Sequence, residues 1–161
     1  MLISYIVCVS LLVIVTFVIH FVGLAGLSVA MRRSRVHPST LTTMFGQGFA
    51  ILSMVIGLFA LHSIEILVYA VAYYWIAAVP DFESALYYST SAFSTVGYGD
   101  VTLKSEWRMM GAVESVNGFL LIGWSTAYLA GISGRARAFA ADIGPLEHQA
   151  PASIDKSTAP D

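Results

Sequence analysis

Three long apolar runs, separated by short polar segments, determine the pattern of the chain. Residues 1–31 carry no charged side chain, residues 45–79 carry only Glu65, and residues 109–132 carry only Glu114. A helix needs about 20 predominantly apolar residues to cross a hydrocarbon core of about 30 Å. Each of the three runs therefore predicts a membrane-spanning helix. A cleaved signal peptide competes for the first run, but it requires basic residues before a shorter apolar stretch, and none precede this one.

A shorter helical pattern lies between the second and third runs. Pro80 stops the second run, and Asp81 and Glu83 supply a cap and a first-turn acid for a helix over residues 84–94. We expect this helix to re-enter the membrane with its carbonyl end towards the membrane centre. Irregular backbone at that depth is tolerated only when it is buried in protein or lines water. The pattern thus predicts an all-α membrane protein in which protein surrounds the segment after residue 94.

Composition supports the membrane assignment. The chain has 161 residues, of which 57% are hydrophobic and 11% are charged, whereas charged residues make up about a quarter of a soluble domain. Its net charge of −2 is too small to indicate nucleic acid or another polyanion as a partner. The single cysteine, Cys8, allows no disulfide within the chain, and the sequence has no nucleotide, phosphate or metal-ligand motif. We therefore expect membrane lipid as a partner and no cofactor.

The most specific motif of the chain follows the short helix and reads Thr95-Val96-Gly97-Tyr98-Gly99-Asp100. Glycine, which lacks a Cβ atom, accepts positive φ, so alternate glycines let successive carbonyls of an extended backbone point to one side. An ordinary tight turn is the alternative, because Gly and Asp are common in turns. The helix-compatible stretch before the motif and the apolar runs on both sides favour the first interpretation. Residues 85–100 resemble the pore helix and selectivity filter of a potassium channel.

This resemblance implies a pore domain over residues 45–133. It would comprise an outer helix (45–79), a pore helix (84–94), a filter (95–100) and an inner helix (109–132), and the first run would be an additional N-terminal transmembrane helix over residues 1–31. In such a filter, main-chain carbonyl oxygens replace the water shell of the potassium ion. By the resemblance, these carbonyls, together with the Thr95 hydroxyl, belong to Thr95, Val96, Gly97 and Tyr98.

The resemblance also implies supports for the filter. Tyr98 would press on Tyr87 and Tyr88 of the pore helix, where the family more often carries tryptophan. Some members place a carboxylate behind the filter at the position of Ser91, and we expect Glu114 of the inner helix to brace this region from another direction. One filter per chain cannot enclose a pore, and the chain has no internal duplication, so we expect the cyclic tetramer of the family.

Several residues are candidates for gating. Gly118 and Gly123 of the inner helix could let it bend, although close helix packing explains them equally well. Glu65 lies one turn from His62, and a carboxylate in hydrocarbon needs a partner or a proton. A structural hydrogen bond to His20 is one explanation, and a proton sensor that involves Glu65 and His62 is the other. The spans lack regularly spaced arginines, so a voltage-sensing helix of the usual kind is not expected.

Basic residues set the expected orientation. Five of the eight lie in the connector over residues 32–44 and shortly after residue 133, and such flanks favour the cytoplasmic side. The N-terminus is then outside, and residues 134–161, which we expect to be a largely disordered tail, are cytoplasmic. The small size of the chain and its lack of processing signals suggest a microbial inner membrane.

The sequence therefore predicts a homotetrameric, potassium-selective channel that conducts passively. A weakly selective cation channel is the alternative within transport, because the tyrosine pair and the serine at position 91 depart from the strongest family pattern. A non-conducting membrane subunit that modulates a partner channel is the alternative from another class. An enzyme is not expected, because no nucleophile, base and orienting residue fall together in the chain. The short tail leaves gating to the pore, to the membrane or pH, or to a separate regulatory subunit.

Overall fold

The computed structural model describes residues 2–34 and 44–143, with side chains for residues 5–32 and 48–132. Regular structure in this part of the chain is helical throughout. Its elements are α1 (Leu2–Ser34), α3 (Met44–Trp75), α4 (Phe82–Phe93), the short 3-10 helix η1 (Ser105–Trp107) and α5 (Arg108–Ile143). The expected all-α fold is thus confirmed for the described residues.

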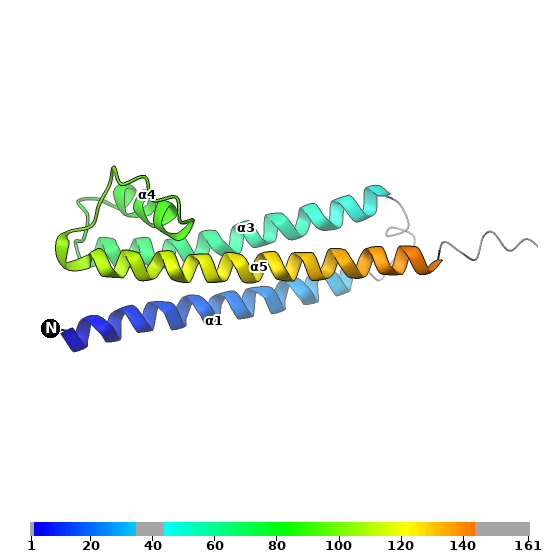
Figure 1. The fold of residues 1–161 in the computed structure, drawn as a ribbon, viewed down its shortest axis with the longest axis horizontal. Coiled ribbons are helices and arrows are strands. Elements are labelled where there is room, and N and C mark those ends of the chain that lie inside the picture. The colour runs from blue at the N-terminus through cyan, green and yellow to red at the C-terminus, as the bar shows by residue number, and fades with distance from the viewer. Residues whose placement is uncertain (1, 35–43, 144–161) are drawn as a thin grey trace, which may run out of the picture.

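The three long helices run side by side, and the short helix α4 lies against one end of them (Figure 1). α4 packs on α3 and α5, and α1 packs on the same two helices. Figure 1 shows α1 and α4 on opposite sides of the α3–α5 pair. The start of α1, the end of α3 and the start of α5 all lie at the end of the molecule that holds α4.

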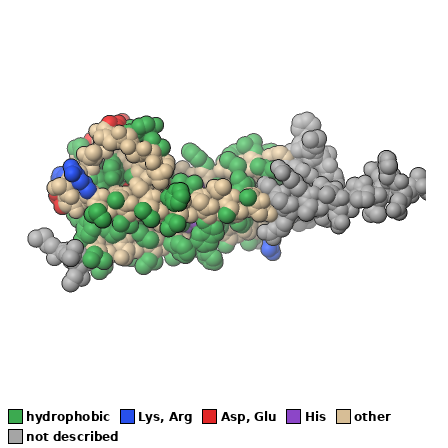
Figure 2. Space-filling view, in the orientation of Figure 1, with side chains coloured by type: hydrophobic (Ala, Val, Ile, Leu, Met, Phe, Trp, Pro, Cys, Tyr) green, Lys and Arg blue, Asp and Glu red, His purple; other side chains and the backbone are tan. Residues whose placement is uncertain are grey.

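Each long helix is long and apolar enough to cross a membrane, over Tyr5–Arg32, Gly48–Trp75 and Ser105–Ile132. Large apolar side chains on these helices are exposed, among them Phe59 at 77% and Phe119 at 66%. On the face that Figure 2 shows, hydrophobic side chains cover the long helices, and acidic side chains lie only near the end that holds α4. The chain is therefore a multi-pass membrane protein.

α3 ends at Trp75, before the predicted end of the outer helix at residue 79. Ala77 has a φ of +50°, and the N–H of Ala78 donates to the carbonyl oxygen of Tyr73 at 3.0 Å, so the chain turns before it reaches Pro80. Ala78 and Val79 are buried in the core. These apolar residues, which the sequence pattern assigns to a longer helix, contribute to tertiary packing instead.

α4 begins at Phe82, ahead of the predicted residue 84, because Asp81 caps it. The Asp81 carboxylate accepts hydrogen bonds from the N–H of Ser84 at 2.7 Å and from the hydroxyl of Ser84 at 3.0 Å. These bonds hold the pKa of Asp81 below its ordinary value.

α5 starts at Arg108 and continues to Ile143. Residues 134–143, the first part of the predicted tail, are therefore helical. Residues 35–43 of the predicted connector and residues 144–161 of the tail lie outside the described residues.

Two groups of buried side chains hold the helices together. The larger group surrounds the contact of α4 with α3 and α5 and includes Tyr69, Tyr73, Phe93, Met110 and Leu121. The second lies between α1 and α3 and consists of Leu24, Met54, Leu58 and Leu61. Lipid is as apolar as these side chains, so close packing and buried hydrogen bonds carry much of the stability of such contacts. The larger group places α4 on the surface of α3 and α5.

Candidate functional site

The segment after α4 has an alternating backbone. Thr95, Gly97 and Gly99 have φ values of +62°, +57° and +78°. The positive φ predicted for the two glycines is confirmed. Thr95 is a β-branched residue, for which this conformation is rare and costs about 1–3 kcal/mol. Neighbouring contacts must offset this cost. We call residues 95–100 the filter segment.

Hydrogen bonds to the end of α4 impose this backbone. The N–H of Thr95 donates to the carbonyl oxygen of Ala92 at 2.9 Å, and the N–H of Gly97 donates to the carbonyl oxygen of Ser91 at 3.1 Å. The hydroxyl oxygen of Ser91 accepts a third bond, from the N–H of Tyr98 at 3.2 Å. Ser91, which stands out in the sequence only for a missing acid, thus binds the filter segment at two points.

Asp100 and Tyr87 fasten the other end of the filter segment to α4. The hydroxyl of Tyr87 donates to the Asp100 carboxylate at 2.7 Å, and the N–H of Val101 donates to the same carboxylate at 3.0 Å. The bond from Tyr87 holds the pKa of Asp100 below its ordinary value, and the same bond raises the pKa of Tyr87. The family resemblance implies that Tyr87 supports the filter through Tyr98. In the structure, the Tyr87 hydroxyl instead forms a hydrogen bond with Asp100.

The side chains of Val96 and Tyr98 are 53% and 71% exposed. Among the described residues, Tyr98 has no ring contact with Tyr87 or Tyr88, so the expected aromatic cuff does not form within one chain. Tyr88 instead packs edge-on against Tyr73 of α3, with ring centroids 5.4 Å apart. The filter segment therefore presents its side chains outwards, where another chain could cover them.

Glu114 of α5 connects three helices behind the filter segment. Its carboxylate accepts a hydrogen bond from the hydroxyl of Ser89 on α4 at 2.5 Å and another from the hydroxyl of Tyr73 on α3 at 2.6 Å. Glu114 and Ser89 are both fully buried. The expected contact between Glu114 and the region of Ser91 on the pore helix is present, through Ser89. A pocket of about 310 Å³ lies nearby, between the filter segment, α4 and α5, and its lining includes Ser91, Gly99 and Gly111.

The main chains of α4 and α5 touch at Gly118. A Cβ atom at this position would lie 2.2 Å from the carbonyl oxygen of Phe93, so a side chain does not fit there. At Gly123, in contrast, a Cβ atom would meet nothing within 4 Å. Of the two interpretations that the sequence leaves open, close packing applies to Gly118. Neither glycine interrupts α5.

Residues 61–132 match a family model described as an ion channel. The matched range begins in α3 and ends in α5, and it contains α4, the filter segment and Glu114. We call this matched range, residues 61–132, the ion-channel domain. Helix α1 and the first half of α3 lie outside the match. No curated protein and no solved structure matches the chain significantly.

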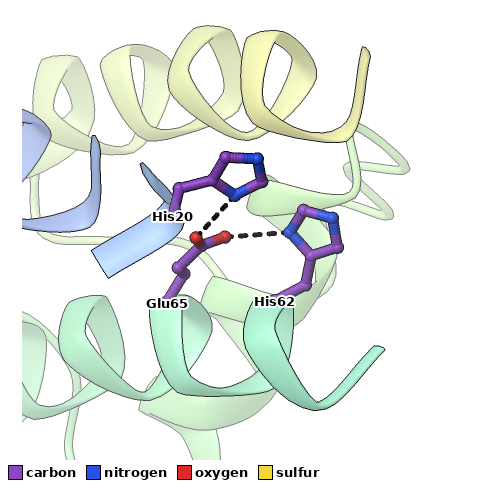
Figure 3. A group of neighbouring side chains, drawn as sticks. All are labelled: His20, His62 and Glu65. Carbon is purple, nitrogen blue, oxygen red and sulfur yellow. Dashed lines mark hydrogen bonds and ion pairs between the residues drawn. The ribbon is translucent and has the colours of Figure 1, made fainter. Parts of the chain in front are cut away.

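Glu65 of the ion-channel domain binds two histidines, one of them on α1. One carboxylate oxygen lies 2.9 Å from Nδ1 of His20, and the other lies 2.8 Å from Nδ1 of His62 (Figure 3). Glu65 and His20 are fully buried, and the His62 side chain is 17% exposed. The hydrogen bond predicted between Glu65 and His20 is therefore confirmed, and it joins α1 to the ion-channel domain.

Asn117 makes a second polar contact between the ion-channel domain and α1. Its side-chain amide donates to the hydroxyl of Thr16 at 2.8 Å and to the hydroxyl of Tyr69 at 3.1 Å. The Asn117 side chain is therefore buried between helices. Sequence reasoning misses this role, and also that of Tyr73, because an almost uniformly apolar span does not reveal which of its faces meets another helix.

Proposed function

We propose that the chain is a potassium-selective channel that conducts passively as a homotetramer. The observation that carries the proposal is the filter segment, in which residues of positive φ alternate directly after a short helix, within an ion-channel domain. Main-chain oxygens can then line one side of the segment. An ordinary tight turn would not explain why three alternate residues, one of them a threonine, share this conformation.

Potassium is a large cation with a weakly held water shell, and neutral oxygens can replace that shell without trapping the ion. We assign this role to the main-chain carbonyls of Thr95, Val96, Gly97 and Tyr98, with the Thr95 hydroxyl as a further ligand. The carbonyl end of α4 precedes them and adds a negative partial charge that favours a cation. No carboxylate is needed in the ion path, so divalent ions gain little there.

One filter segment cannot surround an ion, so several chains must meet around an axis. The side chains of Val96 and Tyr98, which are 53% and 71% exposed in one chain, are available for contact with neighbouring chains. The family resemblance favours four copies. Native mass spectrometry should therefore find a particle of four times the 17.3 kDa of one chain. A monomeric particle in the membrane would exclude the proposal.

We place the filter segment at the outer face of a cell inner membrane, with the N-terminus outside and the C-terminus in the cytoplasm. Arg32 supports this orientation, because it lies near the end of α1 opposite to α4, and basic flanks favour the cytoplasm. The exposed acids Asp81 and Glu83 lie at the α4 end.

The decisive experiment is ion flux through the purified protein in liposomes, without any other component. We expect potassium flux from the wild type and at least a tenfold loss in Gly97→Ala, because alanine is strained at a φ of +57°. Gly26→Ala on α1 is the matched control, since a Cβ atom there would meet nothing within 4 Å. Equal flux through Gly97→Ala and wild type would contradict the assignment of the filter.

The reversal potential in mixed potassium and sodium separates the proposal from a weakly selective cation channel. The specific observation that favours the weaker selectivity is the pair Tyr87 and Tyr88, at positions where the family more often carries tryptophan. A reversal potential that does not shift when the potassium gradient is changed would establish this second function. Silent liposomes that contain folded tetramers would instead favour a non-conducting subunit of a partner channel.

A further inference from the structure

His20, His62 and Glu65 bring three potential metal ligands to one point between α1 and α3. One ring nitrogen of each imidazole and a carboxylate oxygen all lie within 4.8 Å of one another. Figure 3 shows both rings turned towards the carboxylate. Two imidazoles and one carboxylate form a donor set that suits Zn²⁺ and similar divalent transition metals, whereas Mg²⁺ and Ca²⁺ prefer oxygen ligands alone.

The spacing of the donors is close to that of a metal site. In a tetrahedral zinc site with bonds of about 2.0–2.1 Å, neighbouring ligand atoms lie about 3.3 Å apart. The two nitrogen–oxygen distances here are 2.9 Å, from His20 to one carboxylate oxygen of Glu65, and 2.8 Å, from His62 to the other. A small outward shift of each donor would admit an ion. Of the three side chains, only that of His62 is partly exposed, at 17%.

The surroundings of His20 also fit a metal ligand. Nε2 of His20 lies 3.4 Å from the hydroxyl oxygen of Ser125, a buried residue of α5. If Nδ1 binds a metal, Nε2 carries the ring proton and can donate it to the hydroxyl of Ser125, and an outer hydrogen bond of this kind orients a metal-bound imidazole. The His20 ring also contacts Trp124, with ring centroids 5.4 Å apart. α5 therefore holds the ring in place.

We propose that His20, His62 and Glu65 bind a divalent transition metal ion, with Zn²⁺ as the best match. The three side chains leave a fourth position for water. The ion connects α1, which lies outside the ion-channel domain, to α3 within it. Its positive charge also compensates the carboxylate of Glu65, which is costly to bury in a membrane without such a partner.

The site reaches towards the filter segment through His62. The ring of His62 contacts that of Phe93, the last residue of α4, with centroids 5.8 Å apart. Occupation of the site fixes His62 and thereby alters the freedom of the residues that precede the filter segment. This consequence for ion flux rests on the proposed channel function, whereas the binding of metal does not.

Metal binding should be measured on the full-length purified protein, after treatment with a chelator, by titration with Zn²⁺ and with Co²⁺. We expect one ion per chain, a visible Co²⁺ spectrum of tetrahedral type, and a rise in melting temperature with Zn²⁺. His62→Gln should weaken binding at least tenfold. His37→Gln combined with His148→Gln, which removes the other two histidines of the chain, is the matched control and should bind as the wild type does.

A gain of signal protects this test against a variant that fails to fold. In His62→Cys the new thiolate should bind Co²⁺ and produce a sulfur-to-cobalt charge-transfer band, which the wild type lacks although it contains Cys8. Absence of stoichiometric binding to the wild type would overturn the proposal and leave a triad held by hydrogen bonds alone. Equal affinities of the wild type and His62→Gln would overturn it as well.

Flux measurements then separate this site from the channel function. We expect Zn²⁺ to change potassium flux at least twofold in the wild type but not in His62→Gln. If metal binds in the expected stoichiometry and no condition gives flux, the channel function fails and the site stands. If flux is present and metal does not bind, the site fails and the channel function stands.

Discussion

At the scale of single residues, the hydrogen bond between Tyr87 and Asp100 leads us to expect a defined response of the filter segment to acid. The hydrogen bond from Tyr87 lowers the pKa of Asp100 in the folded protein. A carboxyl group with a lowered folded pKa stabilises the fold fully above its unfolded pKa of about 3.9, and it loses this effect as the pH falls through the lower folded value. Both residues are exposed, so solvent screens the interaction.

Tyr87→Phe should therefore make the filter segment more sensitive to acid. Without the donated bond, the pKa of Asp100 returns towards its ordinary value, and protonation begins at a higher pH. We expect potassium flux to decline at a higher pH in Tyr87→Phe than in the wild type when the filter side is acidified. Tyr74→Phe, at another exposed tyrosine, is the control. Coincident pH profiles of Tyr87→Phe and wild type would refute a role for this bond.

Glu114→Gln should weaken the support behind the filter segment. The carboxylate accepts hydrogen bonds from Ser89 and Tyr73, whereas the amide nitrogen of glutamine cannot accept one. A buried hydroxyl that loses its acceptor costs about 1–3 kcal/mol. We expect a loss of this size in the free energy of unfolding, with faster decline of flux through inactivation.

The exposed Glu83 provides the control for that experiment, because Glu83→Gln makes the same chemical change on the first turn of α4. The proposed brace is wrong if Glu114→Gln keeps the stability, the selectivity and the inactivation of the wild type.

The sequence could predict some of these residue roles and not others. Positive φ at Gly97 and Gly99 follows from the residue type, since glycine alone takes that conformation without cost. The same conformation at Thr95 is imposed by hydrogen bonds to α4, which the residue type does not reveal. Ser91 illustrates the same limit, because its two bonds to the filter segment depend on how the chain folds back.

At the scale of elements, the contact between α4 and α5 fixes the position of the filter segment. Alanine is favoured over glycine in a helix by about 1 kcal/mol when nothing else changes. At Gly118 the main chain of Phe93 occupies the space that a methyl group needs, so packing outweighs this preference.

Gly118→Ala should thus push α5 away from α4. We expect a lower melting temperature and at least a tenfold loss of potassium flux, measured on the same preparation. Gly123→Ala is the matched change on the same helix, and we expect it to keep or slightly raise the melting temperature. If both variants melt and conduct alike, then the close approach at Gly118 has no functional weight. A change of flux in Gly123→Ala at unchanged stability would identify that glycine as a hinge.

Element existence was predictable, and element ends were not. Long apolar runs predict the three spans because the thickness of the membrane sets a minimum length. The end of α3 at Trp75 depends on Ala77, whose left-handed conformation nothing in the sequence marks. The start of α4 depends on Asp81, whose capping role could be predicted from residue type with an error of a few residues.

At the scale of the whole molecule, α1 lies on the side of the α3–α5 pair opposite to α4 (Figure 1). If the tetramer axis runs past the filter segments, the four copies of α1 are the helices farthest from it. The sequence suggests this peripheral position only because the first run lacks charge. Its contact with α3 follows from the predicted hydrogen bond between His20 and Glu65. Its contact with α5 was not predictable, since it depends on polar contacts such as the one from Asn117 to Thr16.

Cys8 on α1 tests this arrangement. A disulfide needs Cα atoms within about 7 Å of each other, and peripheral helices of different subunits are farther apart. We expect no covalent dimer when tetramers in liposomes are treated with a mild oxidant. Labelling by a small maleimide serves as the control that the thiol, which is partly buried, can react. Efficient dimer formation through Cys8 would place α1 between subunits and not at the periphery.

The direct contact of main chains at Gly118 and Phe93 leaves no flexible side chain between the inner helix and the residues ahead of the filter segment. A tilt of α5 at this level displaces both backbones together, as in a rigid joint. Motion that spares the ion path is therefore confined to the part of α5 that follows residue 118. A constriction that opened and closed there would not displace the carbonyl oxygens that we assign as potassium ligands.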